Sequence, residues 1–146
     1  AVPLAHSSLC AEPLTLNLNL FIKRQLGTKG KAMKVQYLEI VTSEVDTVCA
    51  TYAQIYDVKF SDVDVNLGGA RTAKLSNGGV IGVRGPLRET EEPVVRHYTL
   101  VKDIEAAVNA AEKLGAEVAV PPIELPRHGM CAIVIQSGVE LGFWQL

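Results

Sequence analysis

The apolar residues of this chain follow the same order of patterns twice, about 60 residues apart. Each half begins with an apolar strand, continues into an amphipathic helix and ends with three short strands separated by Gly or Pro. The first half covers about residues 33–88 and the second about residues 93–146. A chain of 146 residues suits one hydrophobic core. The repeat therefore predicts an α+β domain built from two tandem βαβββ modules.

One helix is expected in each half. Ser43 is placed to cap the first helix, which ends near Tyr56, and Asp103 is placed to cap the second. Gly115 is the expected left-handed terminator of the second helix. Apolar residues at helical spacing predict the face that each helix packs against the sheet. These faces are Val45, Val48, Cys49, Tyr52 and Ile55 in the first helix, and Ile104, Ala107, Val108, Ala111 and Leu114 in the second.

Turn residues separate the expected strands. Asn77-Gly78 predicts a hairpin in which both turn residues take a positive φ, Gly138 closes another, and Pro121-Pro122 marks a loop. Alternate residues of each strand face the helix, so the opposite face has to enclose a cleft. We expect the two halves to form a curved mixed sheet around that cleft. The strands are expected at residues 35–41, 58–63, 71–75, 80–84, 94–101, 117–120, 130–135 and 139–145.

Residues 1–32 form an N-terminal extension of different character. Residues 14–22 alternate between apolar and polar side chains, which predicts an extra edge strand or a contact with a partner subunit. Residues 25–31 are polar and contain glycine, as a linker does. Met33 suits a natural start, in which case the extension is an upstream or artificial remnant. The extension lacks the pattern of a signal peptide.

Charge and cysteine content exclude several classes of function. The net charge is −2 and the basic residues are scattered, so we expect no nucleic-acid partner. No apolar run approaches about 18 residues, so we expect no membrane span. Cys10, Cys49 and Cys131 form no CxxC pair, which favours a reduced, cytoplasmic setting. We expect Cys49 and Cys131 to be buried and to pack as small apolar side chains.

An ordered set of segments extends from Met33 to Leu146. It comprises Glu44-Val45-Asp46 through Phe60, Val95-Arg96-His97-Tyr98 through Val108, Ala116 through Gly129, and Gly138 with Gly142-Phe143-Trp144-Gln145. This set resembles the vicinal-oxygen-chelate superfamily of glyoxalases, bleomycin-resistance proteins and extradiol dioxygenases, in a glyoxalase-like or hydroxylase-like branch. The resemblance implies the tandem βαβββ fold, a homodimer, and a divalent metal held by His, Gln or Glu on the first and fourth strand of each module.

The four metal-ligand positions of that superfamily align with Tyr37, Gly82, Arg96 and Gly142. None of them offers the ligand that the family uses, since glycine has no side-chain donor and a guanidinium has no lone pair to give. We therefore expect no metal and no other cofactor. A shift of the second module by one residue places His97 at the position of Arg96, but such sites need about three protein ligands.

Strand parity places a set of polar and aromatic side chains on the cleft face. Residues 94–101 contribute Arg96 and Tyr98, or His97 and Thr99 if the alignment is shifted. Glu39 either holds an arginine, a ligand cation or a proton, or else stays solvated at the rim or pairs with Arg96. The predicted ligand-binding residues are Tyr37, Glu39, Arg84, Arg96, Tyr98, Glu140 and Trp144.

Three functions fit these expectations. The first is a metal-independent protein that binds a small organic molecule, an organic cation or an aromatic compound that stacks on Trp144. The second is a glyoxalase-like enzyme, a lyase, isomerase or hydroxylase-like protein, which uses Glu39 or His128 as an acid or base on a small oxygenated substrate. The third is a dimerising unit whose cleft is filled by its own side chains, including Trp144. The alternative for His128 is a solvated loop residue, and Arg84 is either a carboxylate clamp near the cleft mouth or a surface ion pair.

Overall fold

A computed structural model describes residues 32–146, of which residues 33–146 form one compact unit. The expectations for residues 14–22, residues 25–31 and Cys10 lie outside the described residues. No helix within residues 32–146 is both long and apolar enough to cross a membrane. In chain order the elements are β1 (Val35–Val41), α2 (Val45–Tyr56), the short 3-10 helix η1 (Val65–Leu67), β2 (Arg71–Lys74), β3 (Val80–Arg84), β4 (Val94–Leu100), α3 (Ile104–Lys113), β5 (Glu117–Leu125), β6 (Gly129–Gln136) and β7 (Val139–Gln145).

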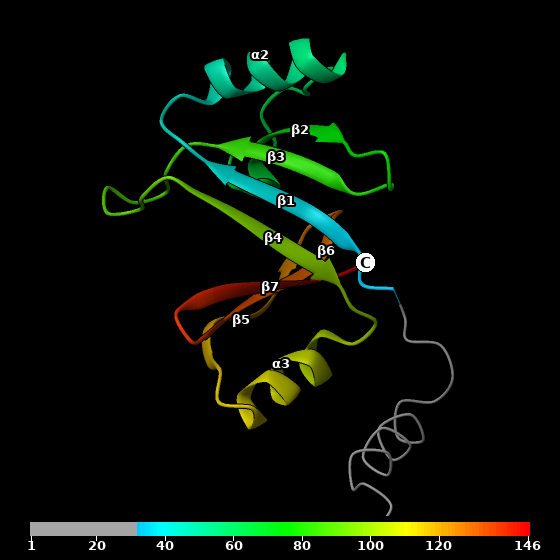
Figure 1. Cartoon of the computed structure of the whole chain (residues 1–146), viewed down its shortest axis with the longest axis vertical. Coiled ribbons are helices and arrows are strands. Elements are labelled where there is room, and N and C mark those ends of the chain that lie inside the picture. Colours follow the sequence, from blue (N-terminus) through cyan, green and yellow to red (C-terminus); the bar gives the residue numbers. More distant parts are fainter. Residues whose placement is uncertain (1–31) are drawn as a thin grey trace, which may run out of the picture. The chain divides into compact units, whose positions relative to one another are not determined.

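All seven strands belong to one curved mixed sheet in the order β2-β3-β1-β4-β7-β6-β5. The two modules meet at β1 and β4, which pair antiparallel, so their strands are continuous rather than two separate sheets. Within the modules, β1 pairs parallel to β3 and β4 pairs parallel to β7. The helices α2 and α3 pack on strands of their own modules, at opposite ends of the view in Figure 1. The predicted α+β fold is confirmed.

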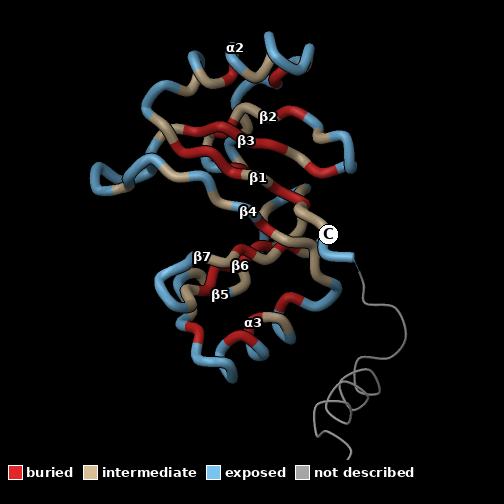
Figure 2. The backbone as a smooth tube through the Cα atoms, viewed as in Figure 1, coloured by how far each residue is buried: buried red, intermediate tan, exposed pale blue. Residues whose placement is uncertain are grey.

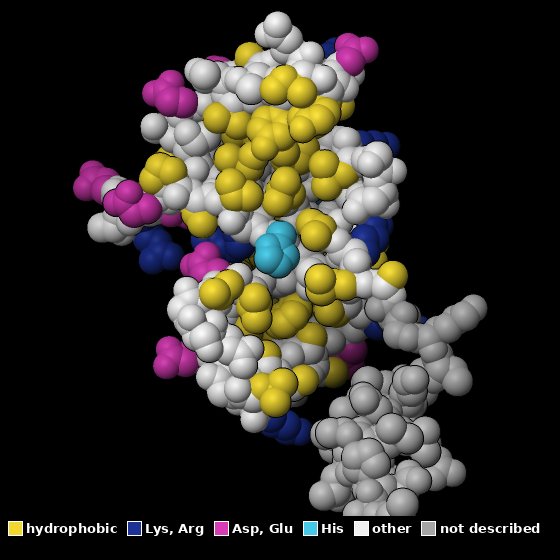
Figure 3. Space-filling model, viewed as in Figure 1, with side chains coloured by type: hydrophobic (Ala, Val, Ile, Leu, Met, Phe, Trp, Pro, Cys, Tyr) yellow, Lys and Arg dark blue, Asp and Glu magenta, His cyan; other side chains and the backbone are white. Residues whose placement is uncertain are grey.

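Three hydrophobic clusters hold this arrangement together. One lies between α2 and the first-module strands around Cys49 and Ile81, and another between α3 and the second-module strands around Val108 and Val134. Figure 3 shows the corresponding hydrophobic groups next to each helix. The buried residues follow the central strands and the sheet-facing side of the helices (Figure 2). The third cluster lies on the opposite face of the sheet and includes Trp144. We call this opposite surface the cleft face.

The two helices begin differently. Asp103 caps α3 as predicted, because its carboxylate accepts a hydrogen bond from the Ala106 backbone N–H at 2.9 Å. The prediction that Ser43 caps α2 is wrong. Glu44 is the N-cap there and makes no side-chain cap bond, while its backbone N–H donates to Thr42 Oγ1 at 3.0 Å. The threonine hydroxyl therefore takes the hydrogen bond at this helix start.

The ends of the helical faces also differ from expectation. Gly115 has φ +90° and ends α3 as predicted. Ile55 and Leu114, however, are exposed. Leu114 is the C-cap with non-helical backbone, so its side chain leaves the apolar face, and the α2 residues that pack on the sheet end at Ala53.

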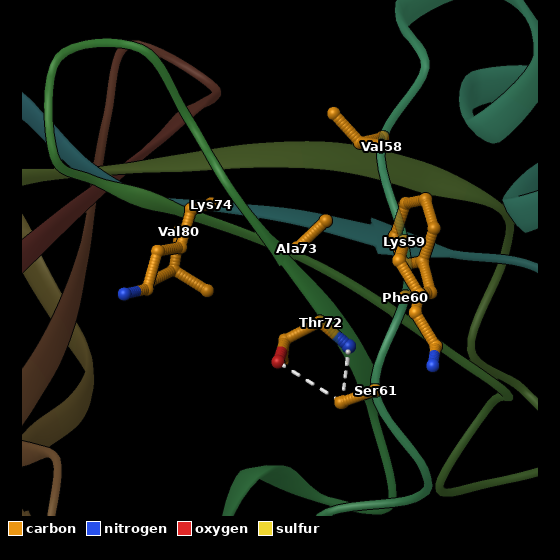
Figure 4. Close-up of a pocket in the computed structure, with 8 residues that line it drawn as sticks. All are labelled: Val58, Lys59, Phe60, Ser61, Thr72, Ala73, Lys74 and Val80. Atoms are coloured by element: carbon orange, nitrogen blue, oxygen red, sulfur yellow. Dashed lines mark hydrogen bonds between the residues drawn. The ribbon is translucent and has the colours of Figure 1, made fainter.

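The strand predicted at residues 58–63 is wrong. This segment runs beside β2 (Figure 4), and the Ser61 backbone N–H donates to the Thr72 carbonyl at 2.8 Å. It then turns into η1, because the Asp64 carboxylate accepts a hydrogen bond from the Asn66 backbone N–H. Polar side chains that bond their own backbone favour such turns over strands.

The loop predicted at Pro121-Pro122 is wrong as well, since both prolines lie inside β5. This strand is the edge of the sheet, and its register to β6 shifts between Val118 and Val120 and again before Ile123. Proline lacks an N–H and is tolerated at edges and bulges, where no ladder bond is lost. The segment is therefore a bulged edge strand rather than a connection.

The two predicted hairpins form. Ser137 and Gly138 both have positive φ, at 52° and 79°, which is the pattern of a type I′ turn. In the other hairpin Gly78 has φ +83°, whereas Asn77 does not take a positive φ. Asn77 instead stabilises its turn by accepting a hydrogen bond from the Gly79 backbone N–H at 2.8 Å.

The contrast between the two helix starts gives the first prediction. Asp103→Ala should lower the free energy of unfolding by about 1 kcal/mol, because one N-terminal backbone N–H of α3 loses its partner. The matched control Ser43→Ala should change it by less than about 0.5 kcal/mol. Urea unfolding followed by circular dichroism measures both. Equal losses for the two variants would contradict the assigned caps.

Candidate functional site

A buried carboxylate lies at the centre of the cleft face. Glu39 on β1 is 7% exposed and accepts a hydrogen bond from Arg84 Nε at 2.7 Å. Its other oxygen accepts from Arg96 Nη1 and, at 3.2 Å, from the Tyr98 hydroxyl. Both carboxylate oxygens are therefore engaged, and a charge that is costly to bury has two cationic partners.

Two further carboxylates extend this arrangement outward. Glu91, in the segment between β3 and β4, binds Arg84 through both oxygens at 2.9 and 2.8 Å, and Glu140 on β7 binds Arg96 Nε at 2.6 Å. The hydrogen bonds from Arg84 lower the pKa of Glu91 to about 2. Burial opposes the charge on Arg84, but its bonds to Glu91 and Glu39 raise its pKa above the usual value. The result is an alternating ionic chain, Glu91–Arg84–Glu39–Arg96–Glu140.

Aromatic side chains lie next to the ionic chain. Trp144 stacks on Tyr37 with ring centroids 4.9 Å apart and meets the Tyr98 ring edge-on at 5.7 Å. The indole N–H donates to the His128 carbonyl at 3.0 Å. Burial, followed by the charge of Glu39, raises the pKa of Tyr37 and of Tyr98 far above the usual range. Both phenols are therefore neutral at physiological pH, and that of Tyr98 donates to Glu39.

Gly82 and Gly142 do not leave open room, because a tyrosine occupies the space over each of them. A Cβ at Gly82 would overlap the Tyr37 hydroxyl, and one at Gly142 would lie 2.6 Å from Tyr98 Cδ1. In both modules a tyrosine of the first strand covers a glycine of the last strand, although Gly82 lies opposite Glu39 and Gly142 lies opposite Tyr98 itself.

The register of β4 shows whether Arg96 and Tyr98, or instead His97 and Thr99, face the cleft. Glu39 lies directly opposite Arg96, and Tyr37 lies opposite Tyr98, across the β1–β4 pair. Arg96 and Tyr98 consequently face the cleft, while His97 is exposed on the strand between them. All seven predicted site residues meet in the ionic chain or the aromatic group. Their role in binding a ligand stays a prediction.

The four superfamily metal positions do not fit a metal ion in this chain. Tyr37 is a neutral phenol, Gly82 and Gly142 have no donor and are covered by rings, and Arg96 is a cation bound to carboxylates. A divalent metal is bound by carboxylate oxygen, imidazole or thiolate. No group of three or more His, Cys, Asp and Glu residues converges within residues 32–146. The positive charge beside Glu39 comes instead from two guanidinium groups.

A cavity of about 190 Å³, which we call the Glu39 cavity, lies beside the ionic chain. Tyr37, Glu39, Arg84, Tyr98 and Trp144 form part of its wall. Sequence reasoning missed the other lining residues, which come from η1, β5, β6 and the segment after β3. They are Asn66, Leu67, Gly68, Leu87, Val120, Ile123, Leu125, Cys131 and Ile133.

The thiol of Cys131 is one of these missed residues. Burial raises its pKa to about 11, so it is a protonated, apolar wall rather than a nucleophile. Cys49 is also buried and free, in the cluster beneath α2. The expectation that both pack as small hydrophobic side chains is confirmed.

His128 connects the two modules at the cleft. Its Nε2 lies 2.8 Å from Asp64 Oδ2, so the loop between β5 and β6 contacts the start of η1. Burial raises the pKa of Asp64, but the bonds from the Asn66 N–H and from His128 outweigh it and lower the pKa below the usual value. His128 is half-buried and is not a freely solvated loop residue.

A wider groove of about 540 Å³ lies at the β2 edge, between residues 58–61 and 72–74 together with Val80 (Figure 4). Its walls are apolar residues of the α2 cluster with Ser61, Thr72 and two lysines. It contains none of the predicted site residues and no pair of ionisable groups in contact. The Glu39 cavity is therefore the stronger candidate site.

Comparisons with known proteins agree with the architecture. No family model matches the chain, and no curated protein matches its sequence. Solved structures do match. A hypothetical protein from Bacillus halodurans has a TM-score of 0.63 and 18% identity, over 80% of this chain and 96% of that one.

Two epimerases are also similar in structure. Methylmalonyl-CoA epimerase from Mycobacterium tuberculosis has a TM-score of 0.60 and 15% identity, over 76% of this chain and 86% of that one. The Streptomyces coelicolor enzyme, in complex with 2-nitronate-propionyl-CoA, has a TM-score of 0.57 and 18% identity, over 77% and 96%. At these identities the likeness establishes the fold, which is that of the vicinal-oxygen-chelate superfamily.

The packing of Tyr37 over Gly82 can be tested by a double-mutant cycle. Gly82→Ala should cost about 1–3 kcal/mol of stability, because the new methyl group overlaps the tyrosine. The same substitution in a Tyr37→Leu background should cost much less, since the ring is gone. Gly85→Ala is the control, because nothing lies within 4 Å of the added Cβ. Additive costs in the cycle would rule out the contact.

The carboxylates of the ionic chain should contribute unequally to the free energy of unfolding, according to how deeply each is buried. Glu39→Gln should lower the free energy of unfolding by about 3–5 kcal/mol, because two buried guanidinium groups lose their shared counter-charge. Glu140→Gln removes a carboxylate whose side chain is 39% exposed and should cost about 1 kcal/mol or less. Chemical denaturation compares the two variants. A Glu39→Gln protein as stable as Glu140→Gln would be inconsistent with this order.

Proposed function

We propose that this chain is a metal-independent protein that binds a small aromatic molecule in the Glu39 cavity. The observation that carries the proposal is the buried Arg84–Glu39–Arg96 group, in which Arg96 stands at one of the four positions that align with metal ligands of the superfamily. A cavity with aromatic and aliphatic walls lies beside this ion-paired group. Mostly apolar cavities with a few fixed polar groups are the usual form of small-molecule sites.

The charges of the site favour an aromatic ligand over an organic cation. Both oxygens of Glu39 already accept hydrogen bonds from guanidinium groups, so a ligand cation finds no free carboxylate there. Arg84 on the cavity wall would repel it further. An apolar ring, in contrast, gains contact with Ile133, Leu125 and Trp144.

The volume limits the ligand to about the size of one ring with a small substituent. A cavity of roughly 150 Å³ in another protein is known to hold benzene. The Glu39 cavity, at about 190 Å³, leaves room for little more. With so few atoms, we expect dissociation constants on the order of tens of micromolar to millimolar.

The second candidate is an acid–base enzyme acting on a small oxygenated substrate, and one observation favours it. His128 is held by Asp64 at 2.8 Å, and a histidine oriented by a carboxylate is a common general base. Glu39 is less suited to that role, because its lone pairs face two arginines.

Titration with small aromatic compounds tests the proposal. The chain has one tryptophan, so intrinsic fluorescence reports on Trp144 at the cavity wall. Benzoate, phenol and benzamide should change the emission in a saturable way, whereas benzyltrimethylammonium should bind at least about tenfold more weakly. NMR of the ligands after incubation separates the two candidates. Ligand recovered unchanged supports binding, and conversion that disappears in His128→Gln supports the enzyme.

A cavity-filling variant provides the control. Ile123→Phe adds a ring at the cavity wall and should weaken binding at least about tenfold, without touching the ionic chain. Val139→Phe changes an exposed residue outside the cavity and should leave binding unchanged. Saturation with equal affinity in both variants would refute binding at this place.

A further inference from the structure

Two neighbouring polar groups at the start of β1 lack partners. Within residues 32–146, the buried side-chain atoms without a hydrogen bond are Gln36 Oε1 and the Tyr37 hydroxyl oxygen. The two residues are 7% and 4% exposed. A buried polar group without a partner typically costs stability, and nearly all such groups in folded proteins are satisfied by protein, water or ligand. Two such groups on consecutive residues indicate a place where a further molecule supplies the partners.

Both side chains line the same second cavity, of about 210 Å³, which we call the Gln36 cavity. It shares Tyr37, Leu67 and Trp144 with the Glu39 cavity. Gln36 belongs to this cavity alone, and Thr72 and His128 close its other sides. The stacked rings of Tyr37 and Trp144 thus form part of the wall of both cavities.

A β-bulge explains how consecutive residues of one strand reach one cavity. In the β1–β4 pair, Val35 lies opposite Thr99 and Tyr37 lies opposite Tyr98, so Gln36 is an extra residue without an opposite partner. Side chains of a regular strand alternate between faces, whereas a bulge redirects one of them. Bulges are frequent next to binding sites for this reason.

We propose that the Gln36 cavity binds a small neutral amide, in particular a lactam with neighbouring N–H and C=O groups. Gln36 Oε1 accepts a hydrogen bond and needs a donor. The neutral phenol of Tyr37 donates and needs an acceptor. An N–H beside a C=O satisfies both at once, and the planar ring of a lactam lies against the Tyr37–Trp144 stack.

The charges around this cavity support a neutral ligand. Arg127 on its rim is exposed to solvent, and His128 is already paired with Asp64. Neither leaves a buried, uncompensated charge for an ionic ligand. The pair of unpartnered groups, by contrast, is complementary to a single amide.

Two probe molecules of similar size test the proposal. Titration with 2-pyrrolidinone, followed by Trp144 fluorescence and by saturation-transfer NMR, should show binding at least about tenfold tighter than titration with cyclopentanone, which lacks the N–H. If both probes bind equally, or if neither binds because the two groups hold only an ordered water, the proposal is wrong.

Variants assign the binding to this cavity. Gln36→Leu keeps the approximate size but removes the amide, so the preference for 2-pyrrolidinone over cyclopentanone should disappear. Ile123→Phe should leave that preference intact, since Ile123 lines only the Glu39 cavity. Benzoate binding should be unaffected by Gln36→Leu, which separates a failure here from a failure of the proposed function. A preference that survives in Gln36→Leu would overturn the assignment.

Discussion

The burial of the Glu39 carboxylate governs the rest of the cleft face. A carboxylate removed from water is stable only with charged or hydrogen-bonding partners. Its partners extend the charges over β3, β1, β4 and β7, which are four adjacent strands of the sheet. Glu39 and Arg96 are directly opposite on β1 and β4, at the only place where the modules pair. The ionic chain therefore joins the two modules across the β1–β4 pair.

Strand parity made much of this site predictable. One face of each strand has to meet a helix, so alternate residues such as Tyr37 and Glu39 had to share the other face. The sequence also has glycine, without a side-chain donor, at the two aligned last-strand positions, Gly82 and Gly142. That Tyr37 lies over Gly82 was not predictable, because it depends on the register of β1 against β3, which hydrophobic alternation alone leaves open.

The predictions that were wrong or absent have local structural causes. Residues 58–63 alternate like a strand, but Asp64 starts a turn by bonding to a backbone N–H. Pro121-Pro122 resembles a loop, yet an edge strand has no partner on one side to lose. Gln36 was overlooked because alternation assigns it to the helix side, and a bulge has no clear signature in a single sequence.

The stacked rings of Tyr37 and Trp144 contribute to the walls of both cavities. A ligand in one cavity that tilts the Trp144 indole changes the shape of the other cavity. Such an effect has to be mutual, because the influence of one guest on the affinity of a second equals the reverse influence. With Trp144 also tied to the His128 carbonyl, movement of this wall reaches the loop between β5 and β6. Ligands that displace the Trp144 indole from either cavity are thereby energetically linked.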